Sequence, residues 1–369
     1  MRIAILTQPL RYNYGGLLQN FALQTILKRM GHDVVTLDPH RYKYTKWQYV
    51  ILILRHCVAR YIKGYRHVPI LGEWMADKPT RMLGTNTFRF IDRYIRRKEY
   101  WDLAHDVKEG EYDAFVVGSD QVWRPEYNTN IGNMFLDFTK GWNVKRIAYA
   151  ASFGVDAWAE SEDITRYCKE NLKQFDFISV REDSGVALCK EVFNVEATHV
   201  LDPTLLLSKE DYISLLKLDK VPKSKGNLLV YILDYTEDKR QLVERIAKQY
   251  DLVPFRVNSD YEDRSADLYT RIQPSVEQWV RGFYDARYVI TDSFHACVFS
   301  IIFGRPFVAY GNGDRGMGRF LSLLEKLALK DCLIRDSNEF LGFYPFNLET
   351  ASLLQEEIKR SKEILIECQ

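Results

Sequence analysis

Short apolar runs alternate along the chain with longer segments in which apolar residues recur every three or four positions. The short runs are typical of buried parallel strands, and the helical spacing is typical of amphipathic helices. The expected strands are residues 2–6, 33–38, 113–117, 145–150, 177–180 and 198–201, then 228–233, 252–257, 288–290 and 307–310. Helical spacing lies between them, as at 17–27, 162–175, 238–250 and 276–285. The alternation predicts an α/β protein with parallel sheets.

This alternation occurs twice, which predicts two domains. A lysine-rich stretch with a proline and a glycine, KLDKVPKSKGN at 217–227, is typical of a linker. A chain of 369 residues also exceeds what one hydrophobic core usually organises. We therefore expect Rossmann-like domains at 1–215 and 225–345 that face each other across a cleft. A helix within 350–369 is expected to pack back on the first domain.

His295 is the sharpest chemical signal in the chain. The strand 288–290 ends in Thr291-Asp292-Ser293, and an uncharged helical segment, 296–303, follows the histidine. Ligands of open α/β sheets bind at the carboxyl ends of strands, and the N–H groups of a helix N-terminus favour an anion. An imidazole at that place suits proton transfer near neutral pH. The same position also fits a histidine that only caps a buried helix.

Polar residues follow other predicted strands in the same way. A polar loop, 12–16, follows the first strand and contains Asn13 and the pair Gly15-Gly16. It lacks a GxGxxG pattern, so a dinucleotide is not implied. For Gly15-Gly16, both a ligand contact and a plain tight turn fit. Arg181 stands at the tip of strand 177–180. Its guanidinium could hold a phosphate or carboxylate of a ligand, or it could pair with Glu182 or another carboxylate of the protein.

The strand 113–117 is followed by Ser119, Asp120, Gln121 and Trp123. Carboxylates and amides bind sugar hydroxyls, and an aromatic ring stacks on the apolar face of a sugar. These four residues therefore predict a sugar site. The alternative is a loop that lies over a tryptophan of the core.

Composition narrows the function classes. The chain has 51 Lys and Arg against 50 Asp and Glu, so its net charge gives no general attraction to nucleic acid or membranes. The six cysteines form no CxxC pair, which predicts neither a structural zinc site nor a disulfide framework and favours a reducing compartment. The N-terminal residues lack the apolar segment of a signal peptide, and we expect a cytoplasmic protein.

Positive charge is concentrated in residues 41–98, where 14 Lys and Arg face three acidic residues. This stretch lies within an interruption of the first domain, 41–100, and contains two segments of helical spacing, 47–63 and 88–97. Basic amphipathic helices can lie on an anionic membrane or bind a polyanion. The alternative is that their apolar faces pack on the domain. No nucleic-acid-binding motif accompanies the basic residues, so we expect no nucleic-acid partner.

Six short motifs resemble the polysaccharide pyruvyl transferase family and occur in that family's order between about residues 3 and 330. They are NYGGLLQ (13–19), GSDQVW (118–123), YAASFG (149–154), ISVRE (178–182), LDPTLL (201–206) and TDSFH (291–295). Each motif is weak alone, but six in order are specific. Two tandem Rossmann-like halves also resemble the glycosyltransferase B architecture.

The resemblance implies that the pyruvyl group of phosphoenolpyruvate is transferred to two hydroxyls of a sugar, in the synthesis of exopolysaccharide, capsule or cell-wall polymers. The family's histidine matches His295, which we expect to be the acid/base, helped by Asp292 or Ser293. Its phosphoenolpyruvate-binding arginine matches Arg181. Arg319, Arg315 and Ser293 are further expected donor contacts.

The acceptor sugar is expected to contact Asn13, Gly15, Gly16, Ser119, Asp120, Gln121 and Trp123. Two positions depart from the family's pattern: Ala296 stands where a glycine is common, and Arg124 where an asparagine often follows the tryptophan. The resemblance requires no metal and no cofactor besides phosphoenolpyruvate as co-substrate. An acceptor carried on a lipid would account for a peripheral contact of 41–98 with the inner membrane face.

Two other functions fit the same scaffold. A glycosyltransferase using a nucleotide sugar would bind a nucleoside diphosphate and ignore phosphoenolpyruvate. A non-catalytic glycan-binding relative would keep the fold without turnover. The sequence indicates neither the acceptor sugar nor the oligomeric state.

Overall fold

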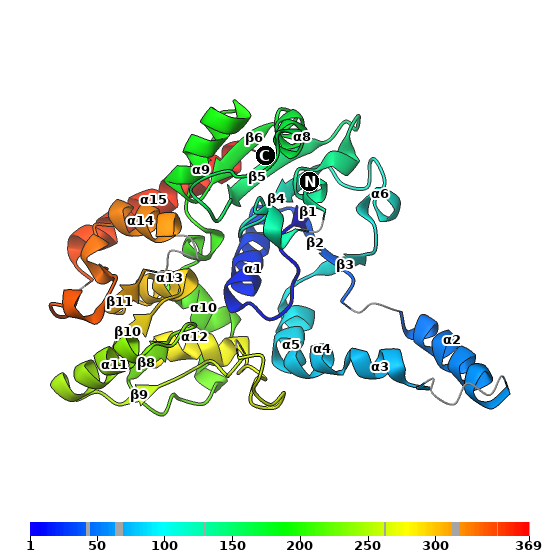
Figure 1. The fold of residues 1–369 in the computed structure, drawn as a ribbon. Helices are drawn as coiled ribbons and strands as arrows, with labels where there is room; N and C mark the ends of the chain where they lie inside the picture. Colours follow the sequence, from blue (N-terminus) through cyan, green and yellow to red (C-terminus); the bar gives the residue numbers. More distant parts are fainter. Residues whose placement is uncertain are drawn as a thin grey trace.

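The structure is a computed structural model that describes residues 1–41, 45–62, 69–128, 130–261, 263–311, 317–344 and 346–368, without the side chains of 73 and 76. Its strands form two sheets, in which every pairing between neighbouring strands is parallel. Figure 1 shows the two sheets with helices around them and with α1, α10 and α13 between them. The predicted α/β fold with two parallel sheets is confirmed.

The first sheet has seven strands in the order β3-β2-β1-β4-β5-β6-β7. They are β1 (Arg2–Leu6), β2 (Asp33–Pro39), β3 (Arg97–Tyr100), β4 (Ala114–Val117), β5 (Lys145–Ala151), β6 (Phe177–Val180) and β7 (Thr198–His199). Six of them lie where the apolar runs predicted strands. The sequence did not predict β3, because RKEY carries no apolar run and lies at the edge of the sheet.

The second sheet has five strands in the order β12-β11-β10-β8-β9. They are β8 (Leu228–Tyr231), β9 (Pro254–Phe255), β10 (Tyr288–Thr291), β11 (Phe307–Tyr310) and β12 (Leu333–Ile334). The central strand β10 is buried along its whole length, as its apolar sequence predicted. The short edge strand β12 was not predicted.

Fifteen α-helices connect and cover these strands among the described residues. They are α1 (Tyr14–Arg29), α2 (Lys46–Cys57), α3 (Gly72–Ala76), α4 (Lys78–Leu83), α5 (Thr85–Tyr94), α6 (Leu103–Asp106), α7 (Ile131–Met134), α8 (Glu162–Leu172), α9 (Asp183–Leu188), α10 (Lys209–Leu215), α11 (Glu237–Gln249), α12 (Val276–Asp285), α13 (Phe294–Ile302), α14 (Met317–Lys326) and α15 (Leu348–Glu367). A short π-helix, η1 (Val58–Ile62), continues α2, and a 3-10 turn, η5 (Pro203–Leu206), lies against α1.

Helices α1 and α13 carry the residues nearest to the region between the sheets. Most side chains of both helices are buried, including the amides of Gln19, Asn20 and Gln24 in α1. A helix that is buried on most sides must be enclosed by other elements, which accounts for their place between the two sheets. Aromatic contacts join the halves there: the rings of Tyr14 and Trp279 stack at 5.4 Å, and Tyr212 meets Phe299 edge-on at 5.0 Å.

The C-terminal helix α15 reaches the first sheet. The backbone N–H of Leu201 donates to the Ser361 hydroxyl at 3.0 Å, and Arg360 donates to the carbonyl of His199 at 2.7 Å. Strand β7 ends at His199 and β8 begins at Leu228. The domain boundaries expected at 215 and 225 lie between these two strands and remain a prediction.

The interruption of the first domain forms a projecting arm, which we define as α2, η1 and α3 (Figure 1). The predicted helix 47–63 is present as α2 and η1 up to Ile62; residue 63 lies outside the described residues. The expectation that apolar faces pack on the domain is right for α5, which buries Phe88, Phe90 and Ile91, and wrong for α2, which buries only Tyr49. No helix among the described residues is long and apolar enough to cross a membrane.

Candidate functional site

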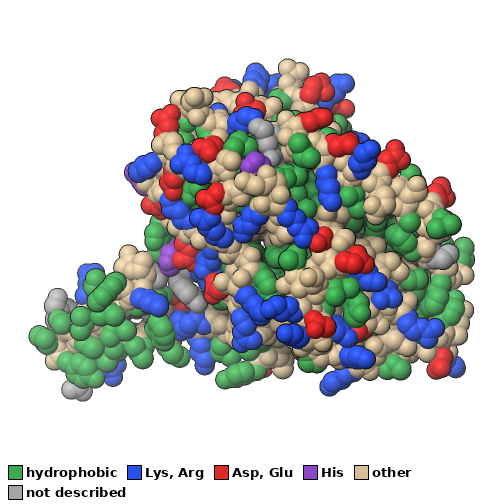
Figure 2. All heavy atoms as spheres, turned by 180° about the vertical axis from the view of Figure 1, so that it is seen from behind, with side chains coloured by type: hydrophobic (Ala, Val, Ile, Leu, Met, Phe, Trp, Pro, Cys, Tyr) green, Lys and Arg blue, Asp and Glu red, His purple; other side chains and the backbone are tan. Residues whose placement is uncertain are grey.

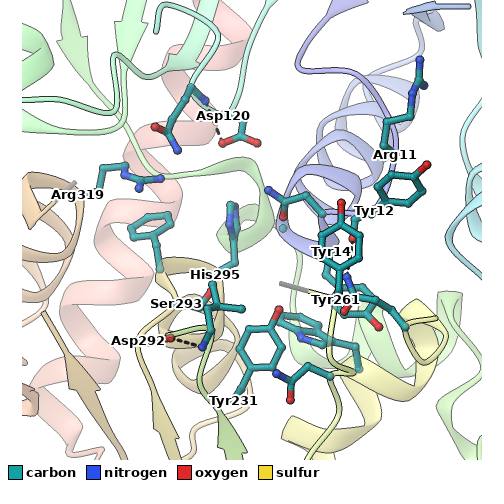
Figure 3. A pocket seen from close by; sticks show the side chains of 18 of the residues that line it. Arg11, Tyr12, Tyr14, Asp120, Tyr231, Tyr261, Asp292, Ser293, His295 and Arg319 are labelled. Atoms are coloured by element: carbon teal, nitrogen blue, oxygen red, sulfur yellow. Dashed lines mark hydrogen bonds between the residues drawn. The ribbon is translucent and has the colours of Figure 1, made fainter. Parts of the chain in front are cut away.

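A cavity of about 390 Å³ lies between the two halves of the molecule. Its walls come from segments that follow strands β1, β4, β8, β9 and β10, together with the start of α14 (Figure 3). The carboxyl ends of parallel strands are the usual ligand side of such sheets, and both sheets present this side to the same cavity. The volume falls in the ordinary range of small-molecule sites, roughly 300–1,000 Å³.

Two helix N-termini border the cavity. Asn13 caps α1 by accepting a hydrogen bond from the N–H of Gly16, and Asn13, Tyr14 and Gly15 line the wall. On the other side, Ser293 precedes α13 and its hydroxyl makes no capping bond to that helix. The N–H groups and the positive dipole ends of both helices favour an anion in this space.

His295 lies in the first turn of α13 and reaches across to the first domain. Its Nε2 is 3.7 Å from Oδ2 of Asp202, an ion-pair distance rather than a hydrogen bond. A Cβ atom on Gly15 would lie 2.0 Å from Nδ1 of the ring, so only glycine leaves room for the imidazole there. The carboxylate beside Nε2 favours the tautomer protonated at that nitrogen, which leaves Nδ1 as the proton acceptor.

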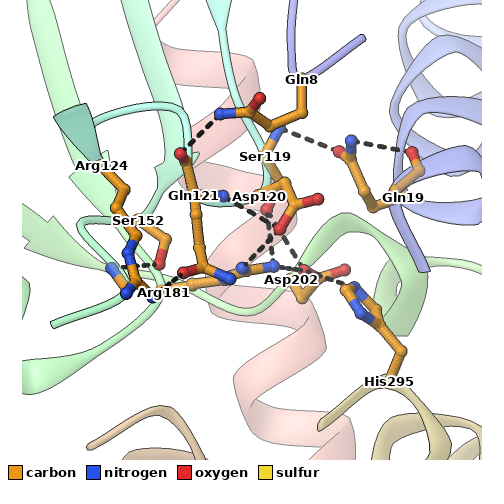
Figure 4. A network of polar contacts seen from close by, with 12 residues as sticks. Gln8, Gln19, Ser119, Asp120, Gln121, Arg124, Ser152, Arg181, Asp202 and His295 are labelled. Carbon is orange, nitrogen blue, oxygen red and sulfur yellow. Dashed lines mark hydrogen bonds and ion pairs between the residues drawn. The ribbon is translucent and has the colours of Figure 1, made fainter. Parts of the chain in front are cut away.

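A buried ion network lies directly behind His295 (Figure 4). Arg181 has a fully buried side chain and donates to Asp202 at 2.7 Å and to Asp120 at 3.1 Å. Burial alone would raise the pKa of Asp202, but His295, Arg181 and the N–H of Thr204 together lower it. Burial would also raise the pKa of Asp120, but Arg181, together with other neighbouring groups, lowers it by more. Both aspartates are therefore ionised near neutral pH.

Asp120 is the member of this network that lines the cavity. One carboxylate oxygen, Oδ1, accepts from Arg181 and from the N–H of Gln121. The other, Oδ2, lies beside Gly16 at the start of α1. The backbone of Asp120 is left-handed, with φ at 76°, a conformation that is uncommon outside glycine and is concentrated at functional sites.

Arg319, in the first turn of α14, brings positive charge to the cavity wall. Burial, with a contribution from Arg181, lowers its pKa to about 10, so it is still protonated near neutral pH. The ring of Phe294 lies near both guanidinium groups, with its centroid 5.2 Å from Cζ of Arg181 and 5.5 Å from Cζ of Arg319. The cavity thus has a cationic wall at Arg319 and a carboxylate wall at Asp120.

A model of the family described as "Polysaccharide pyruvyl transferase" matches residues 13–314, most of the chain. The chain belongs to the polysaccharide pyruvyl transferase family. It is also 24% identical over 246 residues to general stress protein 30 of Bacillus subtilis (strain 168), covering 61% of this chain and 67% of that protein. The matched segment includes most of the residues that line the cavity, whereas Pro9, Arg11 and Tyr12 precede it and Arg319 and Phe320 follow it.

The fold has solved counterparts among glycosyltransferases. The Arabidopsis thaliana protein UGT89C1, in a structure complexed with UDP-L-rhamnose, matches 99% of this chain and 98% of its own with a TM-score of 0.51 and 9% sequence identity. At this identity the likeness concerns the fold alone. The predicted glycosyltransferase B-like architecture of this pyruvyl transferase family member is confirmed.

The cavity brings together most of the predicted site residues of this family member. Asn13, Gly15, Asp120, Gln121, Asp292, Ser293, His295 and Arg319 line it, and Gly16 lines an adjoining hollow of about 170 Å³. Arg315, the weaker expected donor contact, lies outside the described residues. Among the described residues, no group of three or more His, Cys, Asp or Glu could hold a metal ion.

Four predicted residues have surroundings that differ from the expected ones. Trp123 is fully buried, donates from its indole to the carbonyl of Met134 at 3.0 Å and stacks on Phe135, so it cannot stack on a sugar in the cavity. Ser119 is also fully buried, and its hydroxyl donates to Ala150 and to Asp202. Trp123 therefore lies in the core, which was the alternative to a sugar contact. Ser119 is buried in the same way.

Arg181 and Asp292 are engaged by the protein itself. Arg181 does not line the cavity and pairs with carboxylates, which was the alternative to a ligand contact. Asp292 lies at the cavity wall, but its carboxylate accepts from Lys239 at 2.7 Å and from the N–H groups of Leu233 and Asp234. Both oxygens of Asp292 are thus occupied, which favours a role in holding the β8 and β10 loops together over a role in proton transfer.

Sequence reasoning missed two features of the site. Asp202 was part of the quoted LDPTLL motif, but its role depends on its closeness to Arg181 and His295, which no spacing reveals. Several aromatic residues also line the cavity from distant parts of the chain: Tyr12, Tyr14, Tyr127, Tyr231, Tyr261 and Trp279. They lie in loops, in α1, in β8 and in α12, and only the fold brings them together.

Proposed function

We propose that the protein transfers the pyruvyl group of phosphoenolpyruvate to two hydroxyls of a sugar during polysaccharide biosynthesis. The observation that carries this proposal is the joint placement of His295, Arg319 and Asp120 on one cavity. An anionic donor needs a cationic wall, a sugar needs hydrogen-bond acceptors, and the transfer needs a group that moves protons. Membership of the family agrees with each of these roles.

The donor belongs on the second-domain side of the cavity. Phosphoenolpyruvate carries a phosphate and a carboxylate, and Arg319 together with the N-terminus of α13 at Ser293 offers positive charge and N–H donors to them. Arg181 lies behind the cavity wall, where it pairs with Asp120 and lies near the Phe294 ring. Its positive charge acts from there without a contact to the donor. We thus place Arg181 as a positioning residue.

The acceptor sugar belongs on the first-domain side. The Asp120 carboxylate is positioned to accept hydrogen bonds from hydroxyls, and Asn13 and Gln121 add an amide each. Tyr127 replaces Trp123 as the aromatic surface for a sugar ring, because its side chain is exposed at the cavity wall. Its ring is also fixed by Arg124, whose guanidinium lies 4.5 Å from the ring centroid.

In the proposed reaction a proton adds to the methylene carbon of the enolpyruvyl group, and its central carbon becomes oxocarbenium-like. A sugar hydroxyl attacks that carbon, the bond from the carbon to the phosphate oxygen breaks, and the second hydroxyl closes the cyclic ketal. The two sugar hydroxyls lose one proton each. One of these protons makes up for the proton added to the methylene carbon, and the other leaves on the released phosphate. No electrons are exchanged, so the balance requires no redox cofactor. His295 moves these protons, and Asp202 lies beside its Nε2.

Calorimetric titration with phosphoenolpyruvate and with uridine diphosphate tests the donor. We expect wild-type protein to bind phosphoenolpyruvate and not the nucleotide, and Arg319→Gln to weaken that binding about ten-fold or more, since a charge-assisted contact is lost. Release of phosphate in the presence of candidate sugars then tests the transfer, and His295→Ala should abolish it while retaining donor binding. Binding of uridine diphosphate alone would instead favour a nucleotide-sugar glycosyltransferase on the same scaffold.

A further inference from the structure

Exposed apolar residues are concentrated on the arm. Among the described residues, twenty large apolar side chains are exposed, and ten of them lie between residues 47 and 75. Seven belong to α2 and η1: Trp47, Val50, Ile51, Leu54, Val58, Tyr61 and Ile62. Scattered exposed apolar residues need no explanation, but a contiguous group of this kind marks an interaction surface.

The seven residues form one stripe along the arm. Their spacing of three or four positions places them on a single side of the helix. Tyr49, on the other side, is the buried residue of α2 and meets the ring of Trp74 edge-on. Figure 2 shows the arm projecting from the body with apolar side chains covering much of its surface. The described part of the chain does not cover this stripe.

Charge on the arm identifies what covers the stripe. From residue 39 to residue 72 the sequence has no acidic residue and seven Lys or Arg. Lys46 and Arg55 are exposed and flank the stripe on its two sides, and Trp47 and Tyr61 lie near its ends. Apolar residues bordered by cations, with aromatic residues of amphipathic character, are the pattern of helices that lie flat in the surface of an anionic bilayer. A second copy of the arm would bring its cations against those of the first.

We propose that the arm docks the protein on an anionic lipid bilayer, with the seven-residue stripe buried among the headgroups. The short length of α2 and the absence of a spanning helix among the described residues agree with a helix that lies on the surface. This inference rests on the arm alone and is independent of the reaction in the cavity.

Helices α4 and α5, which follow the arm in the sequence, connect it to the cavity. Tyr12, which lines the cavity, donates to the carbonyl of Thr80 in α4 at 3.4 Å and packs against Phe88 of α5. Asn86 of α5 donates to the carbonyl of Gln273, another lining residue, at 2.7 Å. The helices that follow the arm therefore contact cavity-lining residues of both domains, Tyr12 of the first and Gln273 of the second.

Vesicle flotation with the full-length protein tests the proposal. We expect it to float with vesicles of phosphatidylcholine and phosphatidylglycerol, weakly or not at all with phosphatidylcholine alone, and less as salt is raised. Ile51→Asp combined with Leu54→Asp should reduce binding about ten-fold or more, because two apolar side chains leave the bilayer. Lys46→Gln combined with Arg55→Gln should reduce binding to the anionic vesicles and not to neutral ones.

Leu341→Asp is the matched control, because Leu341 is at least as exposed as Leu54 and lies outside the arm. It should float like wild type. All these positions are exposed, so the thermal midpoint of unfolding of each variant should equal that of wild type. Measuring it separates a loss of docking from a loss of fold. Failure of wild type to float, or equal flotation of the Ile51→Asp/Leu54→Asp protein, would overturn the proposal. A dimer that this double variant dissociates, with no effect of lipid, would assign the stripe to a second copy instead.

Discussion

Gly15 of the first domain lies directly against the imidazole of His295 in the second domain. Its backbone is ordinary for a helix, so the need for glycine comes from the imidazole of His295 and not from conformation. We expect Gly15→Ala to lower turnover at least 100-fold, because the methyl group displaces the ring from its place between Gly15 and Asp202. Donor binding, measured by calorimetry, should change little.

A double-variant cycle separates this effect from general damage. If Gly15 acts only by leaving room for the imidazole, adding Gly15→Ala to His295→Ala should cause little further loss of turnover. Additive losses would show that Gly15 has a separate role, such as a direct contact of its backbone with substrate.

Tyr127 tests the acceptor side of the cavity. We expect Tyr127→Ala to raise the KM for the acceptor sugar roughly three- to ten-fold, the value of one aromatic contact, while donor affinity stays the same. Tyr235→Ala is the matched control, because Tyr235 is similarly exposed, also lies under an arginine, and does not line the cavity. Equal kinetics for wild type and Tyr127→Ala would remove Tyr127 from the acceptor site.

The residue scale also shows how far the sequence could predict the site. His295 and Asp120 were predicted because polar residues directly follow apolar strands, and this local signal decides where the backbone places them. Trp123 follows the same kind of strand, yet its ring turns into the core formed by Phe135 and Phe153. The direction of a side chain depends on neighbours from other parts of the chain, which the spacing of residues along the sequence does not contain.

At the scale of elements, the ends of β6 and α14 hold two arginines with opposite roles. Arg181 balances the carboxylates of Asp120 and Asp202, whereas Arg319 faces the cavity. We expect Arg181→Gln to lower the free energy of unfolding by about 3–5 kcal/mol, because it leaves buried carboxylates without their cation. Arg319→Gln should weaken donor binding, because the cationic group on the cavity wall is lost. Chemical denaturation and calorimetry on both variants distinguish the two roles.

The opposite pattern would reverse the assignment of the arginines. A stable Arg181→Gln protein without donor binding would mean that Arg181 leaves its carboxylates and contacts the donor, as the family resemblance implied. The sequence alone left both possibilities open, since a strand-tip arginine looks the same whether its partner is a ligand or an aspartate on another strand.

Helices and strands could be predicted from the sequence where burial requires a recognisable pattern of apolar residues. The fully buried β4 and β10 carry continuous apolar runs, and α12 carries a clear helical period. The edge strand β3 is polar and partly exposed, so its backbone pairing with β2 left no pattern in its side chains. The arm was predicted as a basic amphipathic helix, but whether its apolar side meets the protein or the surroundings is decided by the fold around it.

At the scale of the whole molecule, Asp202 contributes both to the stability of the fold and to the geometry of the site. It pairs with Arg181, which follows β6, and with His295 of the second domain. Its folded-state pKa is below the ordinary value of 3.8. A carboxylate with a lowered pKa stabilises the folded state at pH above its unfolded value, and this stabilisation is lost as pH falls toward the folded value. Asp120 adds a contribution of the same sign.

We therefore expect the thermal midpoint of unfolding to be nearly constant from pH 7 to pH 5 and to fall steeply below about pH 4. Asp202→Asn should lower the midpoint already at pH 7 and make the further fall toward pH 3 shallower. Asp113→Asn is the control, because that carboxylate also has a lowered pKa but is exposed beside Arg2, where solvent screens the pair. An acid profile of Asp202→Asn parallel to that of wild type would show that this carboxylate does not join the two domains, and that the contact between His295 and Asp202 contributes to the reaction alone.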